Sequence, residues 1–169
     1  MKEVAQLLNE MRGARVITNY ALFGAVAQMR YTEPVATLDA DVLVVVPAAE
    51  RLDVLTPIYE FCVRKGYTLE GESVRVWAWP VQFIPVFSPL TREALEQADT
   101  AEFDRVPFRV VRADYLALIA LSVGRAKDFA RILALLEAGS VTPEGIAILA
   151  QRHGLSDAWT RFKTRFLDD

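Results

Sequence analysis

The feature that most constrains this chain is an apolar, β-branched run that opens with two aspartates. Asp39 and Asp41 lead into residues 42–46, whose sequence is VLVVV, and Pro47 follows. β-Branched residues favour strands and proline closes them, so the pattern predicts a buried strand over residues 38–46. Residues two apart on a strand point to the same side, so both carboxylates are expected at one edge of a sheet. Such a pair can form a metal site, but acidic residues at strand ends are also common as ordinary solvated side chains. The surrounding sequence must decide between these two interpretations.

A hard divalent cation fits the predicted edge. Proteins hold Mg²⁺ with one or two carboxylates together with phosphate oxygens of a substrate, and Mn²⁺ accepts the same ligands. The two aspartates, Asp39 and Asp41, are therefore the candidate metal ligands.

Charge and composition narrow the function classes. The chain has 169 residues, 53% of them hydrophobic, which is enough for a substantial core in one or two domains. A net charge of -3 disfavours a protein that coats nucleic acid nonspecifically. Residues 1–108 carry 10 basic and 15 acidic side chains, a net charge of -5, whereas residues 109–169 carry 9 basic and 7 acidic ones, a net charge of +2. The acidic part of the chain holds the candidate metal site.

Cysteine and histidine are too scarce for most other chemistries. The single cysteine, Cys62, cannot form an internal disulfide, and the single histidine, His153, cannot build a zinc site with it alone. We expect a reducing, cytoplasmic environment, with Cys62 as a buried thiol and His153 at a helix end. A Cys-His dyad is the alternative, but no motif supports it. The charged, amphipathic N-terminus and the short apolar runs predict neither a signal peptide nor a membrane partner.

Helices and strands alternate in the first two thirds of the chain. Thr91 is a candidate cap for a helix that starts near Pro89, and the dipeptide Trp79-Pro80 is the expected turn between two strands. Hydrophobic periodicity predicts helices at 3–12, at 26–31 and over about 15 residues ending at Gly66, and strands at 17–23, 38–46, 73–79, 81–87 and 107–111.

From Arg112 onward the periodicity is helical throughout. Helices are expected at 114–123, 126–138, 143–152 and 155–167. The sequence thus predicts an α+β domain over residues 1–111, with a mixed sheet and flanking helices, followed by a helical bundle over residues 112–169 that packs against it. Trp159, Phe162 and Phe166 alternate with basic residues, which is compatible with an RNA-binding strip, but their helical spacing favours the core.

Several segments resemble the polymerase-β-type nucleotidyltransferases, and among them the AbiEii-like bacterial nucleotidyltransferases, which include toxins. The resemblance rests first on Tyr20–Ala27, Glu33-Pro34 and the aspartate-bearing segment Ala36–Val44. It extends through Pro80–Pro85, Ser88–Ala94, Leu116–Leu121, Gly124–Asp128 and Arg131-Ile132. It implies a nucleotidyltransferase-like fold for most of the chain.

The resemblance also implies roles for single residues. Gly24 and Ala25 would bind the nucleotide, because small residues let the backbone approach phosphate oxygens. Asp39 and Asp41 would be catalytic and would bind Mg²⁺ or Mn²⁺. The chain departs from the family pattern at Ala25, where a second glycine or a serine is usual, and at Gln82, where many members place a third carboxylate.

A second cluster implied by the resemblance lies in the helical region. Lys127 and Asp128 match a catalytic Lys-Asp pair that starts a helix near the nucleotide, and Arg125 and Lys127 would contact phosphate. The alternative is that the three residues decorate the first turn of a surface helix, where an acidic side chain is favoured by the helix dipole.

Two functional classes follow from this resemblance. The first is an enzyme that transfers a nucleotidyl group from an NTP to a hydroxyl of RNA, protein or a small molecule, with a toxin-like role and an antitoxin partner as a further implication. The second is a weakened relative that binds a nucleotide or a partner chain. The pair of Asp39 and Asp41 favours the enzyme, since a purely structural descendant has little reason to keep it.

Overall fold

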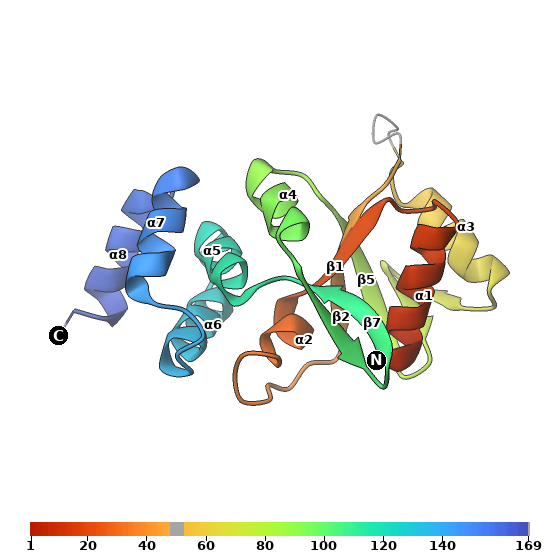
Figure 1. Cartoon of the computed structure of the whole chain (residues 1–169), viewed down its shortest axis with the longest axis horizontal. Coiled ribbons are helices and arrows are strands. Elements are labelled where there is room, and N and C mark those ends of the chain that lie inside the picture. Colours follow the sequence, from red (N-terminus) through yellow and green to blue (C-terminus); the bar gives the residue numbers. More distant parts are fainter. Residues whose placement is uncertain (48–52, 169) are drawn as a thin grey trace. The chain divides into compact units, whose positions relative to one another are not determined.

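The strands of the chain form one mixed sheet. The computed structural model describes residues 1–47 and 53–168, and within them seven strands pair in the order β3-β4-β5-β2-β1-β7-β6 (Figure 1). Their bounds are β1 Asn19–Phe23, β2 Ala40–Val45, β3 Thr68–Glu70, β4 Ser73–Val76, β5 Trp79–Pro85, β6 Asp99–Phe103 and β7 Val106–Val110. The pairs β2-β5 and β1-β7 are parallel, and the other pairs are antiparallel.

The predicted strand behind the two aspartates is the central one. β2 has three strands on either side of it in the sheet, and four of its six residues are buried. A strand covered on both faces needs apolar side chains in consecutive positions, which explains the uninterrupted run after Asp41. The prediction of a buried strand here is confirmed, with bounds shorter by two residues at the start and one at the end.

Four helices accompany the sheet in the first region. They are α1 (Lys2–Gly13), α2 (Gly24–Gln28), α3 (Thr56–Arg64) and α4 (Pro89–Glu96). The buried stripe of α1 packs against β7, and α4 packs against β1 and β2 (Figure 1). α4 is capped by Ser88, whose hydroxyl accepts from the Thr91 amide at 3.1 Å. The prediction of Thr91 as the cap was wrong. The Thr91 hydroxyl instead accepts from the Ser88 backbone amide, which completes a capping box.

Three other local predictions need correction. The turn between β4 and β5 lies at Trp77-Ala78, with Trp77 at φ +56°, and Pro80 is accommodated in β5 because it precedes the first residue pair with β2. The short strands β3 and β6 were missed because all residues of β3 are exposed and β6 buries only Ala101. α3 is nine residues long, and residues 48–52, which include part of the expected helix, lie outside the described residues.

In the second region, all regular elements of the residues that the structure describes are helices, as predicted. They are α5 (Ala113–Val123), α6 (Ala126–Glu137), α7 (Pro143–Arg152) and α8 (Ser156–Phe166). α5 packs against the other three, and Trp159 and Phe162 are buried, which confirms the core assignment of that aromatic pattern. Among residues 1–47 and 53–168, no helix has the length and apolar character needed to cross a membrane.

The chain divides into two compact units. The first comprises residues 1–27 and 36–111, and the second comprises residues 28–35 and 112–169. Residues 28–35 are tied to the helices by Arg131, which donates to the Gln28 amide oxygen at 3.0 Å, and by Ser140, which donates to the Tyr31 carbonyl at 2.6 Å. They therefore belong with the helical unit and not with the domain predicted at 1–111. How the two regions pack together stays a prediction.

Candidate functional site

Asp41 occupies the first part of the central strand, between two neighbours. Its residue partners are Phe23 on β1 and Gln82 on β5. Side chains of directly opposed residues lie on the same face of a sheet, so the Gln82 amide stands beside the Asp41 carboxylate. Gln82 is the residue at which the family resemblance implied a third carboxylate, and both side chains are half-buried.

Gly24 is held against the Asp41 carboxylate. It follows the last residue of β1 and has φ +66°, a conformation that favours glycine. A Cβ at this position would overlap Oδ2 of Asp41 and would lie 3.2 Å from its Cγ. The glycine is therefore required twice, for its backbone conformation and for the space that Asp41 fills. The turn and the carboxylate, which lie seventeen positions apart in the sequence, are in direct contact.

Asp39 lies one residue before β2 and is exposed. The Thr37 hydroxyl stands 3.0 Å from the Asp39 carbonyl oxygen and 3.2 Å from Oδ1 of its carboxylate. This contact restrains the approach to the strand and leaves the carboxylate accessible to solvent. Sequence reasoning did not single out Thr37; a hydroxyl two residues before an aspartate was the available signal, because Ser and Thr commonly bond to nearby backbone in turns.

A magnesium or manganese ion at this edge of the sheet stays a prediction. Asp39 and Asp41 would supply two carboxylates and Gln82 a neutral amide oxygen, a donor chemistry that suits Mg²⁺ when substrate phosphates complete its shell. No cluster of three or more His, Cys, Asp and Glu occurs in the described part of the chain. Ala25, the half-buried second residue of α2, adds a methyl group and no hydroxyl.

The second cluster lies at the start of α6, in the helical unit. Asp128 is 2% exposed, and its Oδ2 accepts from the Arg125 amide at 3.1 Å and from the Arg125 Nε at 2.7 Å. Burial raises the pKa of Asp128, but the hydrogen bonds and charge of Arg125 and the charge of Arg131 outweigh it, so the pKa is lowered. Asp128 thus caps α6 as an anion. Lys127 is exposed in the first turn. The contacts of Asp128 agree with a structural role in the first turn of α6, which is the alternative given above. The phosphate and catalytic roles of the cluster stay predictions.

The alternative Cys-His chemistry has no support in the structure. Cys62 is fully buried in α3, and burial raises the pKa of its thiol to about 12, so the group is protonated at neutral pH and is a poor nucleophile. His153 caps the end of α7 in the other unit. Both expectations, a buried thiol and a histidine at a helix end, are confirmed.

Comparison with known proteins identifies the fold. No protein-family model matches the chain, and no curated protein matches its sequence. Among solved structures, an antigenic nucleotidyltransferase-like protein from Paracoccidioides brasiliensis is similar with a TM-score of 0.57, 15% sequence identity and coverage of 93% of this chain and 90% of that one. The antibiotic-resistance factor ANT(2'')-Ia is similar with a TM-score of 0.54, 13% identity and 96% coverage of both chains.

These likenesses define the class of the protein at the level of fold. Both extend over nearly the whole chain, which therefore has a nucleotidyltransferase-like fold with helices C-terminal to a mixed sheet. The predicted fold class is confirmed. The narrower resemblance to AbiEii-like proteins stays a prediction, because identities this low establish the fold and not the function.

Proposed function

We propose that the protein is an enzyme that transfers a nucleotidyl group from an NTP to a hydroxyl acceptor with the help of Mg²⁺ or Mn²⁺. The observation that carries the proposal is the contact between Gly24 and Asp41, at the start of the central strand. When a glycine turn packs against a carboxylate, phosphate oxygens can approach the backbone and a cation that bridges them to the carboxylate can lie next to them.

In the proposed reaction the acceptor hydroxyl loses its proton to the surrounding water, its oxygen bonds to the α-phosphorus of the NTP, the bond from that phosphorus to the oxygen bridging to the β-phosphate breaks, and pyrophosphate leaves. Asp39 and Asp41 would hold the cation, which supplies charge neutralisation for the phosphates when it is bound. Gly24 and Ala25 would let the backbone approach the triphosphate. Lys127 and Arg125 would add positive charge, and Asp128 would orient Arg125, to which it is already bonded. Catalysis of this kind is mainly positioning and electrostatic stabilisation.

A second function is favoured by one specific observation. Gln82, and not a carboxylate, stands opposite Asp41 on β5. An amide binds Mg²⁺ less strongly and cannot take a proton from the acceptor hydroxyl. A weakened relative that binds a nucleotide or a partner chain without turnover would keep the Gly24-Asp41 contact and lose only this carboxylate.

The test is transfer of label from each of the four radiolabelled NTPs to small RNA, to protein and to small hydroxyl compounds, with and without Mg²⁺. We expect transfer by the wild type and by Asp99→Asn, an exposed aspartate on β6, and none by Asp39→Asn. Nucleotide binding without transfer under every condition would favour the binding module instead. The preferred base and the acceptor class are direct readouts.

The toxin-like role is a finer proposal with its own test. Expression in a bacterial host should arrest growth, and Asp39→Asn should remove the arrest. A co-expressed partner protein that restores growth by binding the wild type would be the antitoxin. Normal growth with an enzymatically active wild type would overturn the toxin-like role and leave the transferase activity standing.

A further inference from the structure

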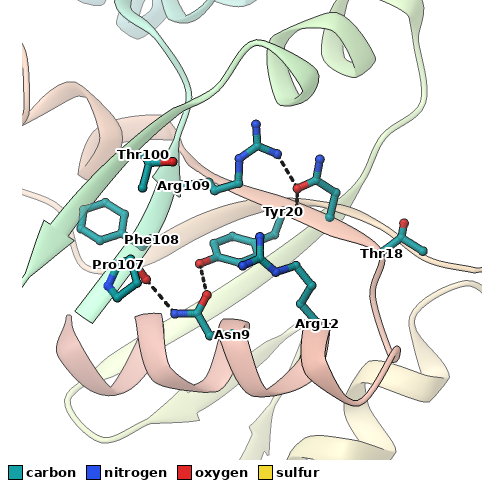
Figure 2. Close-up of a pocket in the computed structure, with 9 residues that line it drawn as sticks. Asn9, Arg12, Thr18, Tyr20, Thr100, Pro107, Phe108 and Arg109 are labelled. Atoms are coloured by element: carbon teal, nitrogen blue, oxygen red, sulfur yellow. Dashed lines mark hydrogen bonds between the residues drawn. The ribbon is translucent and has the colours of Figure 1, made fainter. Parts of the chain in front are cut away.

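A pocket of about 390 Å³ lies at the opposite end of β1 from Gly24. Figure 2 shows it between α1 and the sheet, closed on one side by the hairpin of β6 and β7. All of its lining residues belong to the first unit. It is lined by Asn9, Arg12, Thr18, Asn19, Tyr20, Thr100, Pro107, Phe108 and Arg109.

A hydrogen-bond network fixes the walls of this pocket. The fully buried Tyr20 donates its hydroxyl to Oδ1 of Asn9 at 2.8 Å, and Asn9 donates its Nδ2 to the Pro107 carbonyl at 2.7 Å. Arg109 donates to the Asn19 side-chain oxygen and, at 3.2 Å each, to two backbone carbonyls, those of Glu96 and Ala98. The dashed bonds in Figure 2 hold the polar groups in place before any ligand arrives. Preorganisation of this kind lowers the entropic cost of binding.

The pocket is positively charged, and no acidic side chain among the described residues that line it balances this charge. Among the residues that the structure describes, the lining contains two guanidinium groups, those of Arg12 and Arg109, and no carboxylate. The acceptors on Arg109 are an amide and two carbonyls, all neutral, and Arg12 stands 5.8 Å from the centre of the Tyr20 ring. Burial lowers the pKa of Arg109, and the charge of Arg12 lowers it further, so the two cations repel each other. Both remain charged, since arginine does not lose its proton in proteins.

We propose that this pocket binds a small anion of the phosphomonoester class. Arg12 presents a fork of N–H donors that matches phosphate oxygens, whereas the terminal nitrogens of Arg109 already donate to Asn19, Glu96 and Ala98, so Arg109 contributes mainly its charge. An anion between the two cations relieves their mutual repulsion. The volume falls in the range of about 300–1,000 Å³ typical of small-molecule sites. Phe108 and Pro107 add apolar surface for the remainder of the ligand.

A small molecule fits these observations better than a nucleic acid strand. A strand is held by a row of cations along its phosphates, whereas this pocket gathers its two arginines in one place. The chain also carries a net charge of -3, which opposes a long polyanion more than a small one.

The test is titration calorimetry with inorganic phosphate and with ribose 5-phosphate, in EDTA and at constant ionic strength. EDTA removes any cation from Asp39 and Asp41, so a signal from that edge of the sheet is suppressed. We expect saturable binding of ribose 5-phosphate that weakens at least about tenfold in Arg12→Gln, the loss of one charge-assisted bond. Arg12 is exposed and lies in the last turn of α1, so its replacement should leave the fold intact. Arg64→Gln, at the exposed end of α3, is the matched control and should bind like the wild type.

Arg109→Gln gives a second variant. It should lose binding as well, provided that circular dichroism shows it to be folded, because Arg109 also links β7 to β1. The proposal is overturned by an absence of saturable binding at millimolar ribose 5-phosphate or by unchanged affinity in Arg12→Gln. It is also overturned if an RNA oligonucleotide binds more tightly through Arg12 than ribose 5-phosphate does. Asp41→Asn should bind ribose 5-phosphate normally, so the result is independent of the proposed transferase activity.

Discussion

The two ends of β1 differ in charge and in how each could hold a phosphate. At the end of the strand, Phe23 stands opposite Asp41 and Gly24 packs on the carboxylate. At its start, Asn19 and Tyr20 face a pocket with two arginines and no acidic side chain. The acidic end has to recruit a cation before it can hold phosphate, whereas the basic end can take an anion directly. One strand therefore separates the two proposed sites within a single unit, and a substitution at either end tests one proposal without touching the other.

The largest expected effect is that of Asp41→Asn. Removing one of two carboxylates should reduce nucleotidyl transfer by about 1,000-fold, the scale seen when a preorganised electrostatic contact is lost. The free energy of unfolding should change by about 1 kcal/mol or less, since asparagine keeps the size of the side chain that packs on Gly24. Transfer kinetics and chemical denaturation measure the two quantities. Full turnover in this variant would show that the acidic end of β1 is not the catalytic site.

Gly24→Ala separates two reasons for a glycine at this position, the space that Asp41 fills and the positive φ of the backbone. Gly24 and Gly71 have φ of +66° and +63°, but a Cβ at Gly71 meets nothing within 4 Å, while one at Gly24 overlaps Asp41. Both alanine variants should lose about 1–2 kcal/mol of stability from backbone strain. Gly24→Ala alone should also lose about 100-fold in transfer, because Asp41 has to move. Equal activity in the two variants would show that transfer does not depend on the contact between Gly24 and Asp41.

Gln82→Asp would make the acidic end more acidic. A carboxylate opposite Asp41 should raise the affinity for Mg²⁺ by about tenfold, the scale of a neighbouring ligand effect on a metal site. Without the ion, the added like charge should lower the melting temperature, and saturating Mg²⁺ should restore it. Gln82→Asn controls for the shorter side chain. If Gln82→Asp melts identically with and without the ion, the edge between β2 and β5 does not hold a cation.

The smallest functional effect is expected for Asp128→Asn, in which a carboxylate that already has a partner is removed. Its pKa is lowered in the folded state, so its contribution to stability is present above the unfolded pKa and is lost as pH falls through the folded one. At pH 7 the variant should be less stable by about 1–3 kcal/mol, because a buried hydrogen-bond acceptor of Arg125 is weakened.

Denaturation across the acidic range measures this prediction. The gap between wild type and Asp128→Asn should narrow as the pH falls below about 4, the ordinary range of an aspartate. Glu144→Gln, an exposed carboxylate in the first turn of α7, is the control and should show little change. A gap that is the same at pH 3 and pH 7 would mean that Asp128 acts through packing and not through its charge.

Most of the fold could be predicted because its strongest signals are local. The helices after Arg112 begin and end within one or two residues of their predicted bounds, since periodic apolar faces and glycine breaks mark them. β2 was found from its β-branched run. The edge strands β3 and β6 were missed because exposed, polar strands carry no alternating pattern, and Trp77-Ala78 was missed because a tryptophan at positive φ is not a usual turn signal.

By itself, the sequence determined the order of the helices and of the buried strands, and the two aspartates at the start of the central strand. Spacing along a strand and periodicity along a helix are short-range properties, so they can be recognised from neighbouring residues in the sequence alone. Only the tertiary structure decided that Gly24 touches Asp41, that Gln82 stands beside it, and that Arg12 and Arg109 share a pocket. These contacts depend on strand register and on the packing of α1 against β7, which bring distant residues together without leaving a pattern in the residues between them.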